Sequence, residues 1–156
     1  MSDFTGPGNY KIWARHSDKV LNIWGGDEEG KRVARMLNIA RADLTNGKYG
    51  EYYQQYVIAA AGNDEYLILH QKKGLYMTAT RGGNDNVHLN WTSPMNPDAR
   101  WKIIPVRDRS GAYSIESVGN PGQVLDIQGS QTADDTPVLT WRGNKGKNQQ
   151  FFLRMA

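Results

Sequence analysis

The sequence contains no cysteine, which excludes a disulfide framework, a thiolate zinc site and a cysteine nucleophile. It also lacks any run of 18 apolar residues, so a membrane-spanning helix and membrane insertion are not expected. Residues 1–8 do not show the charged-then-apolar pattern of a secretory signal. We therefore expect a cytoplasmic protein in a reducing compartment, with unconventional secretion as the alternative.

Strong charge of one sign is absent as well. Nineteen Lys and Arg residues against sixteen Asp and Glu residues give a net charge of +3. The densest basic cluster, Arg142, Lys145 and Lys147, stands among Gly and Asn residues and is typical of a solvated loop. A protein that binds nucleic acid usually concentrates its basic residues on one face, so no nucleic-acid partner is expected.

The chain shows no pattern of catalytic or metal-ligating residues. His16, His70 and His88 lack the spacing of metal ligands. Asp134 and Asp135 are adjacent, and neighbouring side chains of an extended chain point to opposite sides. They therefore cannot face each other across a glycosidic bond, as the two carboxylates of a glycosidase must. Since no nucleophile, base and orienting group can be assembled, we expect neither an enzyme nor a bound metal or cofactor.

Internal repeats are present in the 156 residues, which suffice for one domain. A Tyr-x-Ile pattern occurs three times, and each copy is followed by two short apolar segments and a closing aromatic residue. The patterns begin at Tyr10, Tyr66 and Tyr113; the apolar segments are 20–23 and 33–36, 76–79 and 87–91, and 124–127 and 138–141; the closing residues are Tyr56, Trp101 and Phe151. Gly-rich and Pro-Gly turns separate the segments, so each repeat predicts four short strands.

Three repeats of four strands predict an all-β protein, a β-trefoil with pseudo-threefold symmetry and one domain over residues 1–156. The repeats run over about 8–60, 61–108 and 109–156. The three closing aromatic residues occupy equivalent positions and are expected in the core. Residues 31–44 carry a broken helical stripe and are the one candidate helix, and the extra length of the first repeat is placed between Asn38 and Tyr52.

The third repeat combines a carboxylate, an aromatic residue and an amide in a pattern that is suited to binding a sugar. Asp126 can accept hydrogen bonds from two adjacent hydroxyls, and the Asn148 amide can donate to one of them. The indole of Trp141 can stack on the apolar face of a pyranose. An axial hydroxyl, as in galactose, gathers the C–H groups on one face of the ring.

These motifs resemble those of the ricin-B-type lectins, whose repeats carry a Leu-Asp motif, an aromatic platform and a closing Gln-x-Trp. The closing motif is Gln149-Gln150-Phe151 in the third repeat and Gln54-Gln55-Tyr56 in the first, and it has become Ala99-Arg100-Trp101 in the second. Glu65-Tyr66-Leu67-Ile68 and Leu21-Asn22-Ile23-Trp24 are similar to the middle and first repeats of fungal agglutinins of the Sclerotinia type. The resemblance covers essentially the whole chain.

The resemblance implies a lectin that binds galactose or N-acetylgalactosamine without altering it, and a role in fungal defence. It places the main site in the third repeat, although Leu139 stands where relatives often have Gln. The implied residues are Asp126, Gln128, Gly129, Trp141, Asn148 and Gln149. Of these, Gln149 is expected to tie the loops together rather than to contact the sugar. The second repeat has Thr78, Asp98 and Ala99 at the matching positions and is expected not to bind sugar.

The resemblance also implies a second, modified site in the first repeat. There Asn22 replaces the motif Asp, and Tyr53 precedes the closing Gln. The implied residues are Asn22, Trp24, Gly25, Gly26, Arg35 and Tyr53.

The expected partners are glycans with terminal galactose or N-acetylgalactosamine on glycoproteins or glycolipids. A single shallow site binds with a dissociation constant of about one millimolar, so avidity requires two sites per chain or a homodimer. The alternative function is a β-trefoil protease inhibitor that acts through the surface loop over residues 38–51. A trefoil that binds another protein is a third interpretation, and it leaves Asp126 and Trp141 without a purpose.

Overall fold

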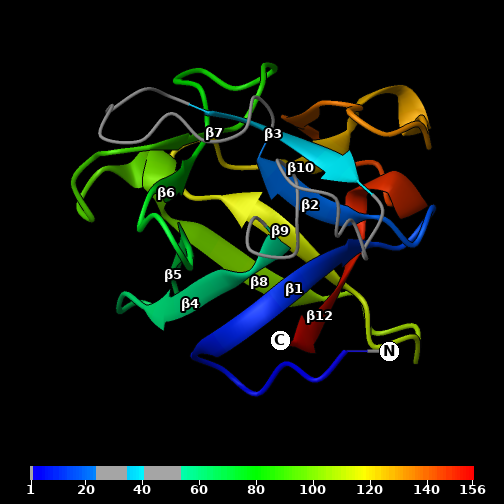
Figure 1. Cartoon of the computed structure of the whole chain (residues 1–156), viewed down its shortest axis with the longest axis horizontal. Coiled ribbons are helices and arrows are strands. Elements are labelled where there is room, and N and C mark those ends of the chain that lie inside the picture. Colours follow the sequence, from blue (N-terminus) through cyan, green and yellow to red (C-terminus); the bar gives the residue numbers. More distant parts are fainter. Residues whose placement is uncertain (1, 24–34, 41–53) are drawn as a thin grey trace.

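The computed structural model describes residues 2–23, 35–40 and 54–156, without the side chains of Arg35 and Met36. Its strands form one continuous sheet with a dozen members (Figure 1). They are β1 (Gly8–Ala14), β2 (Val20–Ile23), β3 (Arg35–Ala40), β4 (Tyr56–Ala60), β5 (Tyr66–His70), β6 (Tyr76–Thr78), β7 (His88–Asn90), β8 (Trp101–Pro105), β9 (Tyr113–Ser117), β10 (Gln123–Ile127), β11 (Val138–Arg142) and β12 (Phe151–Met155). Short 3-10 turns lie at η2 (Pro97–Ala99), η3 (Gln128–Ser130) and η4 (Lys147–Gln149). None of the helical segments in this described part has the length or apolar character needed to span a membrane.

Six of the strands close into a ring. β1 pairs with β12 and β4, β4 pairs with β5, β5 with β8, β8 with β9, and β9 with β12, all antiparallel. Burial alternates along β1: Tyr10, Ile12 and Ala14 are buried, and the residues between them are partly exposed. One face of the strand therefore packs on the core and the other faces outward, as expected for a strand of the ring. A closed ring leaves its strands no free edge.

The other six strands form three hairpins, β2–β3, β6–β7 and β10–β11. They gather at one end of the ring, in the upper part of Figure 1. The hairpins are joined by pairing of β3 with β7 and by single bridges from Asn38 to Pro137 and from Asn86 to Leu139. A six-stranded ring with three hairpins is the β-trefoil that the repeats predict.

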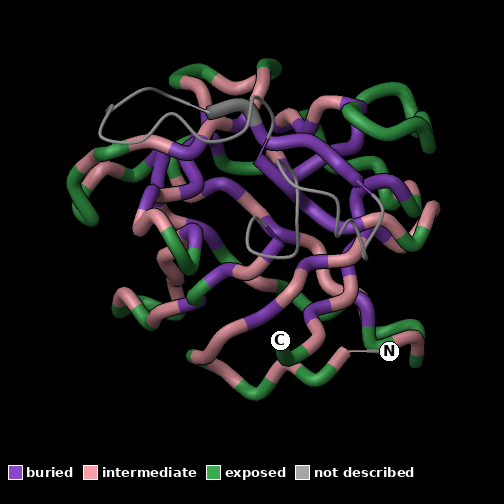
Figure 2. Tube along the Cα trace, in the orientation of Figure 1, coloured by how far each residue is buried: buried purple, intermediate pink, exposed green. Residues whose placement is uncertain are grey.

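The core is built from equivalent residues of the three repeats. The closing residues Tyr56, Trp101 and Phe151 are fully buried, which confirms their predicted place in the core. Trp101 satisfies its indole N–H by donating to the Met77 carbonyl oxygen at 2.9 Å. Buried residues lie along the strands and exposed residues in the connecting loops of the second and third repeats (Figure 2).

The N-terminal segment completes the packing. The ring of Phe4 lies 5.4 Å from Tyr10, 5.7 Å from Tyr66 and 5.4 Å from Tyr113, measured between ring centroids. These three tyrosines begin the three repeats, so one aromatic ring from outside the repeats fills the space among them. The Asp3 amide donates to the Leu153 carbonyl oxygen at 2.7 Å and fixes this segment beside β12.

One element of the first repeat differs from its prediction, which is wrong. The third strand is β3 rather than residues 33–36, and residues 35–40 of the candidate helix are extended. Pairing of β3 with β2 buries Leu37 and Ile39 on alternate positions, which outweighs the weak helical spacing. The predicted insertion falls mainly on residues 41–53, outside the described part of the chain.

We expect Trp101→Ala to lower the free energy of unfolding by about 3–5 kcal/mol, because it opens a cavity and removes a buried hydrogen bond. Trp91→Ala is the matched control, since this indole is 52% exposed and its loss costs about 1 kcal/mol or less. Urea unfolding of both variants measures the difference. Equal losses in the two variants would contradict the assigned core.

Candidate functional site

The candidate site lies on the outer face of the β10–β11 hairpin. Asp126 is paired with Leu139, and Val124 with Trp141, in the antiparallel register. Directly opposed residues project from the same face, so these four side chains stand together. The alternate residues Leu125, Ile127 and Val138 belong to the hydrophobic core.

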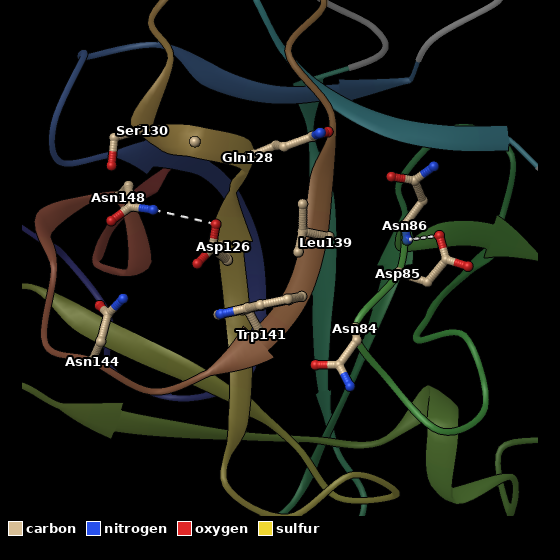
Figure 3. A pocket seen from close by; sticks show the side chains of 11 residues that line it. Asn84, Asp85, Asn86, Asp126, Gln128, Ser130, Leu139, Trp141, Asn144 and Asn148 are labelled. Atoms are coloured by element: carbon tan, nitrogen blue, oxygen red, sulfur yellow. Dashed lines mark hydrogen bonds between the residues drawn. The ribbon is translucent and has the colours of Figure 1, made fainter.

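A groove of about 630 Å³ crosses this face, within the size range of small-ligand sites. One side is formed by η3 and the segment before β12, and the other by the loop between β6 and β7 (Figure 3). Its lining residues are Asn84, Asp85, Asn86, Asp126, Gln128, Gly129, Ser130, Leu139, Trp141, Asn144 and Asn148.

Asp126 is the fixed point of the groove. Its side chain is only 6% exposed, and each carboxylate oxygen accepts one hydrogen bond from the protein. Asn148 Nδ2 donates to Oδ1 at 3.2 Å, and Gln149 Nε2 donates to Oδ2 at 2.8 Å. A carboxylate has about four acceptor positions, so both oxygens keep capacity for hydroxyl donors.

Asn148 is committed to holding this carboxylate. Its Nδ2 also donates to the Ile127 carbonyl oxygen at 3.2 Å, so both amide hydrogens are used within the protein. The sequence analysis expected the amide to donate to a ligand. In this arrangement Nδ2 orients Asp126, and only Oδ1 of Asn148 is left, as an acceptor.

Gln149, one of the residues implied for the third-repeat site, does not line the groove. It is buried behind Asp126, where Nε2 donates to the Arg142 carbonyl oxygen at 3.0 Å and Oε1 accepts from the Asn144 amide at 2.8 Å. Gln149 therefore ties the β11–β12 connection to β10 and positions the carboxylate.

The electrostatics of Asp126 follow from its burial. Desolvation raises the pKa of this carboxyl above its ordinary value, while the hydrogen bonds from Gln149 and Asn148 and the charge of His16 act in the opposite direction. A partly desolvated carboxylate is a stronger hydrogen-bond acceptor than one in water. The site thus presents an acceptor that water does not fully satisfy.

Trp141 supplies an apolar surface beside this acceptor. The residue is 44% exposed, unlike the closing aromatic residues of the repeats, which are fully buried. Gln128 and Gly129, exposed residues of η3, also line the groove. The structure therefore brings together five of the six residues predicted in the third repeat, with Gln149 directly behind them.

The matching positions of the second repeat are built differently. Thr78 takes the place of the carboxylate, and its hydroxyl donates to the Tyr76 carbonyl oxygen at 2.9 Å. Asp98 stands where the third repeat has Asn148, and Asn96 caps its backbone N–H at 3.0 Å. The second repeat accordingly places no carboxylate on β6.

The predicted first-repeat site falls largely outside the described part of the chain. Asn22 is buried in β2, opposite Asn38. Trp24, Gly25, Gly26 and Tyr53 lie outside the described residues, as does the side chain of Arg35, so this site stays a prediction. The same holds for residues 41–51 of the loop on which protease inhibition would depend.

Sequence reasoning missed the residues that the second repeat contributes to the groove. Asn84, Asp85 and Asn86 come from a turn that the sequence marks by Gly82 and Gly83. Pseudo-threefold symmetry places each hairpin beside the next, and that symmetry is the signal that could have found them. Within residues 2–23, 35–40 and 54–156, no group of three or more acidic or histidine side chains is arranged to hold a metal ion.

Comparison with known proteins agrees with the fold. Residues 52–141, more than half of the chain, match the family model of the ricin-type beta-trefoil lectin domain-like proteins. The chain therefore belongs to this family and is a carbohydrate-binding protein of the lectin type, which confirms the resemblance seen in its motifs.

Particular relatives point the same way. The agglutinin of Sclerotinia sclerotiorum is 29% identical over 156 residues, covering 96% of this chain and 97% of the relative. The agglutinin of Rhizoctonia solani superposes with a TM-score of 0.77 at 19% identity, covering 98% of both chains. The ricin B-like lectin of Macrolepiota procera, solved in complex with lactose, gives a TM-score of 0.73 at 19% identity, covering 99% of this chain and 100% of that lectin.

We expect the stability of the wild type relative to Asp126→Asn to increase as the pH falls. Burial raises the pKa of Asp126, so the folded protein holds this proton more tightly than the unfolded chain does. The resulting stabilisation is complete below the unfolded pKa and is lost as the pH rises through the raised folded pKa. Urea unfolding of both proteins between roughly pH 4 and pH 7 measures it. A difference that shrinks in acid would show that the hydrogen bonds outweigh burial.

Proposed function

We propose that this lectin binds terminal galactose or N-acetylgalactosamine in the third-repeat groove and releases it unaltered. One observation carries the proposal: a buried carboxylate, Asp126, is oriented by two amide donors beside the half-exposed indole of Trp141. In the described part of the chain, the Asp126 carboxylate and the exposed face of Trp141 line the same groove.

The chemistry of the two groups favours a sugar with an axial hydroxyl. The free acceptor positions of Asp126 suit a pair of adjacent hydroxyls, and the face of Trp141 suits the C–H groups opposite them. In galactose the axial hydroxyl leaves such a face exposed. A sugar with that hydroxyl equatorial would leave the buried acceptor unpaired, which is the usual source of sharp discrimination.

The relatives support the same class of ligand, since one of the similar structures holds lactose, a galactose-containing disaccharide. The partners would be glycoproteins or glycolipids that carry such termini. Cross-linking of cells would require two sites per chain or a homodimer, because a single shallow site binds with a dissociation constant of about one millimolar.

We expect Trp141→Ala to weaken binding of methyl β-galactoside at this site by about tenfold or more, because it removes the stacking face. Trp91→Ala is the matched control: this tryptophan is also exposed but does not line the groove, and its loss should leave the affinity unchanged. Titration calorimetry with each variant measures the affinities. Normal binding by Trp141→Ala would overturn the assignment.

We expect Asp126→Asn to weaken the same affinity by about tenfold or more, since hydrogen bonds to a charged acceptor contribute about 1.5–3 kcal/mol each. The amide is nearly isosteric, but its NH2 group faces one of the two amide donors that orient Asp126. Thermal unfolding of the variant is therefore measured beside its affinity, and a loss of binding by a folded variant reports on the site. A glycan array with the wild type beside this variant tests the sugar class. Signal confined to glycans without galactose or N-acetylgalactosamine would contradict the proposed specificity.

A further inference from the structure

The loop between β6 and β7 forms one wall of the groove through Asn84, Asp85 and Asn86, and hydrogen bonds hold it in place. Its backbone is tied to the hairpin of the third repeat: the Thr140 amide donates to the Asp85 carbonyl oxygen at 3.1 Å, and the Val87 amide donates to the Val138 carbonyl oxygen at 2.9 Å. Within the loop, the Thr80 hydroxyl donates to the Asn86 carbonyl oxygen at 2.7 Å. The wall therefore has a fixed position relative to Asp126.

Gln123 and Gly83 hold the β6–β7 loop close to β10. Gln123 Oε1 accepts from the Asn84 amide at 2.9 Å, joining the loop to β10. A Cβ on Gly83 would lie 2.0 Å from that same oxygen, so a larger residue at this position would make the end of the Gln123 side chain move away and give up its bond to the Asn84 amide. Gly83 and Gln123 are positioning residues for the wall.

The wall offers polar groups at a distance from the first sugar position. Asn84, Asp85 and Asn86 lie on one side of Leu139, and Asp126 with Asn148 lies on the other (Figure 3). One Asp85 oxygen accepts from the Asn86 amide at 2.7 Å, and the other carboxylate oxygen is available. A monosaccharide centred on Asp126 and Trp141 would leave this half of the groove empty.

The charge of the groove restricts what can fill that half. Asp85 and Asp126 are both acidic, and the lining within the described part of the chain contains no Lys, Arg or His. An anionic group between two carboxylates would be repelled without a compensating cation. Neutral hydroxyls and amides meet acceptors and amide donors instead.

We propose that Asn84, Asp85 and Asn86 form a second subsite, which takes a neutral sugar unit adjoining the galactose and rejects a sialylated or sulfated one. This inference rests on the proposed function and deepens it, because it names the class of oligosaccharide that the groove selects. The second repeat, which has no carboxylate on its own β6, thus contributes to recognition through the groove of the third.

The test compares methyl β-galactoside with a panel of extended galactosides by titration calorimetry. The panel holds lactose, N-acetyllactosamine and an α-galactosyl-extended lactose as neutral members, and sialyllactoses as anionic members. We expect at least one neutral member to bind about fivefold more tightly than the monosaccharide, the gain of about one net hydrogen bond. The sialyllactoses should show no such gain.

Three variants separate the contributions of the wall. Asn84→Ala combined with Asn86→Ala should remove the gain of the neutral oligosaccharide and leave the affinity for methyl β-galactoside unchanged. Asp85→Asn should keep that gain and raise the relative affinity for sialyllactose. Gly83→Ala should weaken the gain, because the added Cβ displaces the Gln123 side chain from the Asn84 amide, whereas Gly82→Ala, a glycine of similar backbone conformation with no atom within 4 Å of an added Cβ, should reduce it less.

The outcomes distinguish this inference from the function on which it rests. If methyl β-galactoside binds but no neutral oligosaccharide binds more tightly, or if the gain survives in the double alanine variant, the second subsite is wrong and the proposed function stands. If neither galactose nor N-acetylgalactosamine binds, the proposed function fails, and this inference fails with it.

Discussion

The hydrogen bonds that Asn148 and Gln149 donate to the Asp126 carboxylate are the constraint on which the groove depends. They join β10 to the segment that leads into β12 and leave an acceptor that is buried yet open on one side. Their geometry is set by η4, the short turn that ends at Gln149. Without that turn the carboxylate would lose both amide donors. Its burial would then cost free energy, and its remaining acceptor positions would have no fixed direction.

The trefoil explains how one chain can keep three copies of a scaffold and use them differently. The ring and its core need the closing aromatic residue of every repeat, so Tyr56, Trp101 and Phe151 are all buried. The outer faces of the hairpins carry no such requirement. The second repeat has Thr78 where the third has Asp126. Its β6–β7 loop instead forms one side of the groove of the third repeat.

The sequence predicted the fold because the trefoil is repetitive, and three weak patterns at matched spacing reinforce one another. It misplaced β3, where Leu37 and Ile39 fit a strand and a broken helical stripe equally well until pairing with β2 is known. It also grouped Asp126 with Trp141, and the two residues lie on neighbouring strands of one hairpin. It missed Asn84–Asn86 because their position depends on how the hairpins of different repeats meet. For Gln149 the closing motif favoured a role in tying the loops together, and the structure shows this side chain bonded to Asp126 and to the β11–β12 connection.

The most direct test is a titration of nitrogen-labelled protein with methyl β-galactoside, followed by nuclear magnetic resonance of the side-chain N–H groups. The account predicts that the indole signal of Trp141 and the amide signals of Asn148 and Gln149 shift together. Methyl β-glucoside should leave all three nearly unchanged at the same concentration. If galactoside instead shifted the indole of another tryptophan and left Trp141 silent, the third-repeat groove would not be the sugar site.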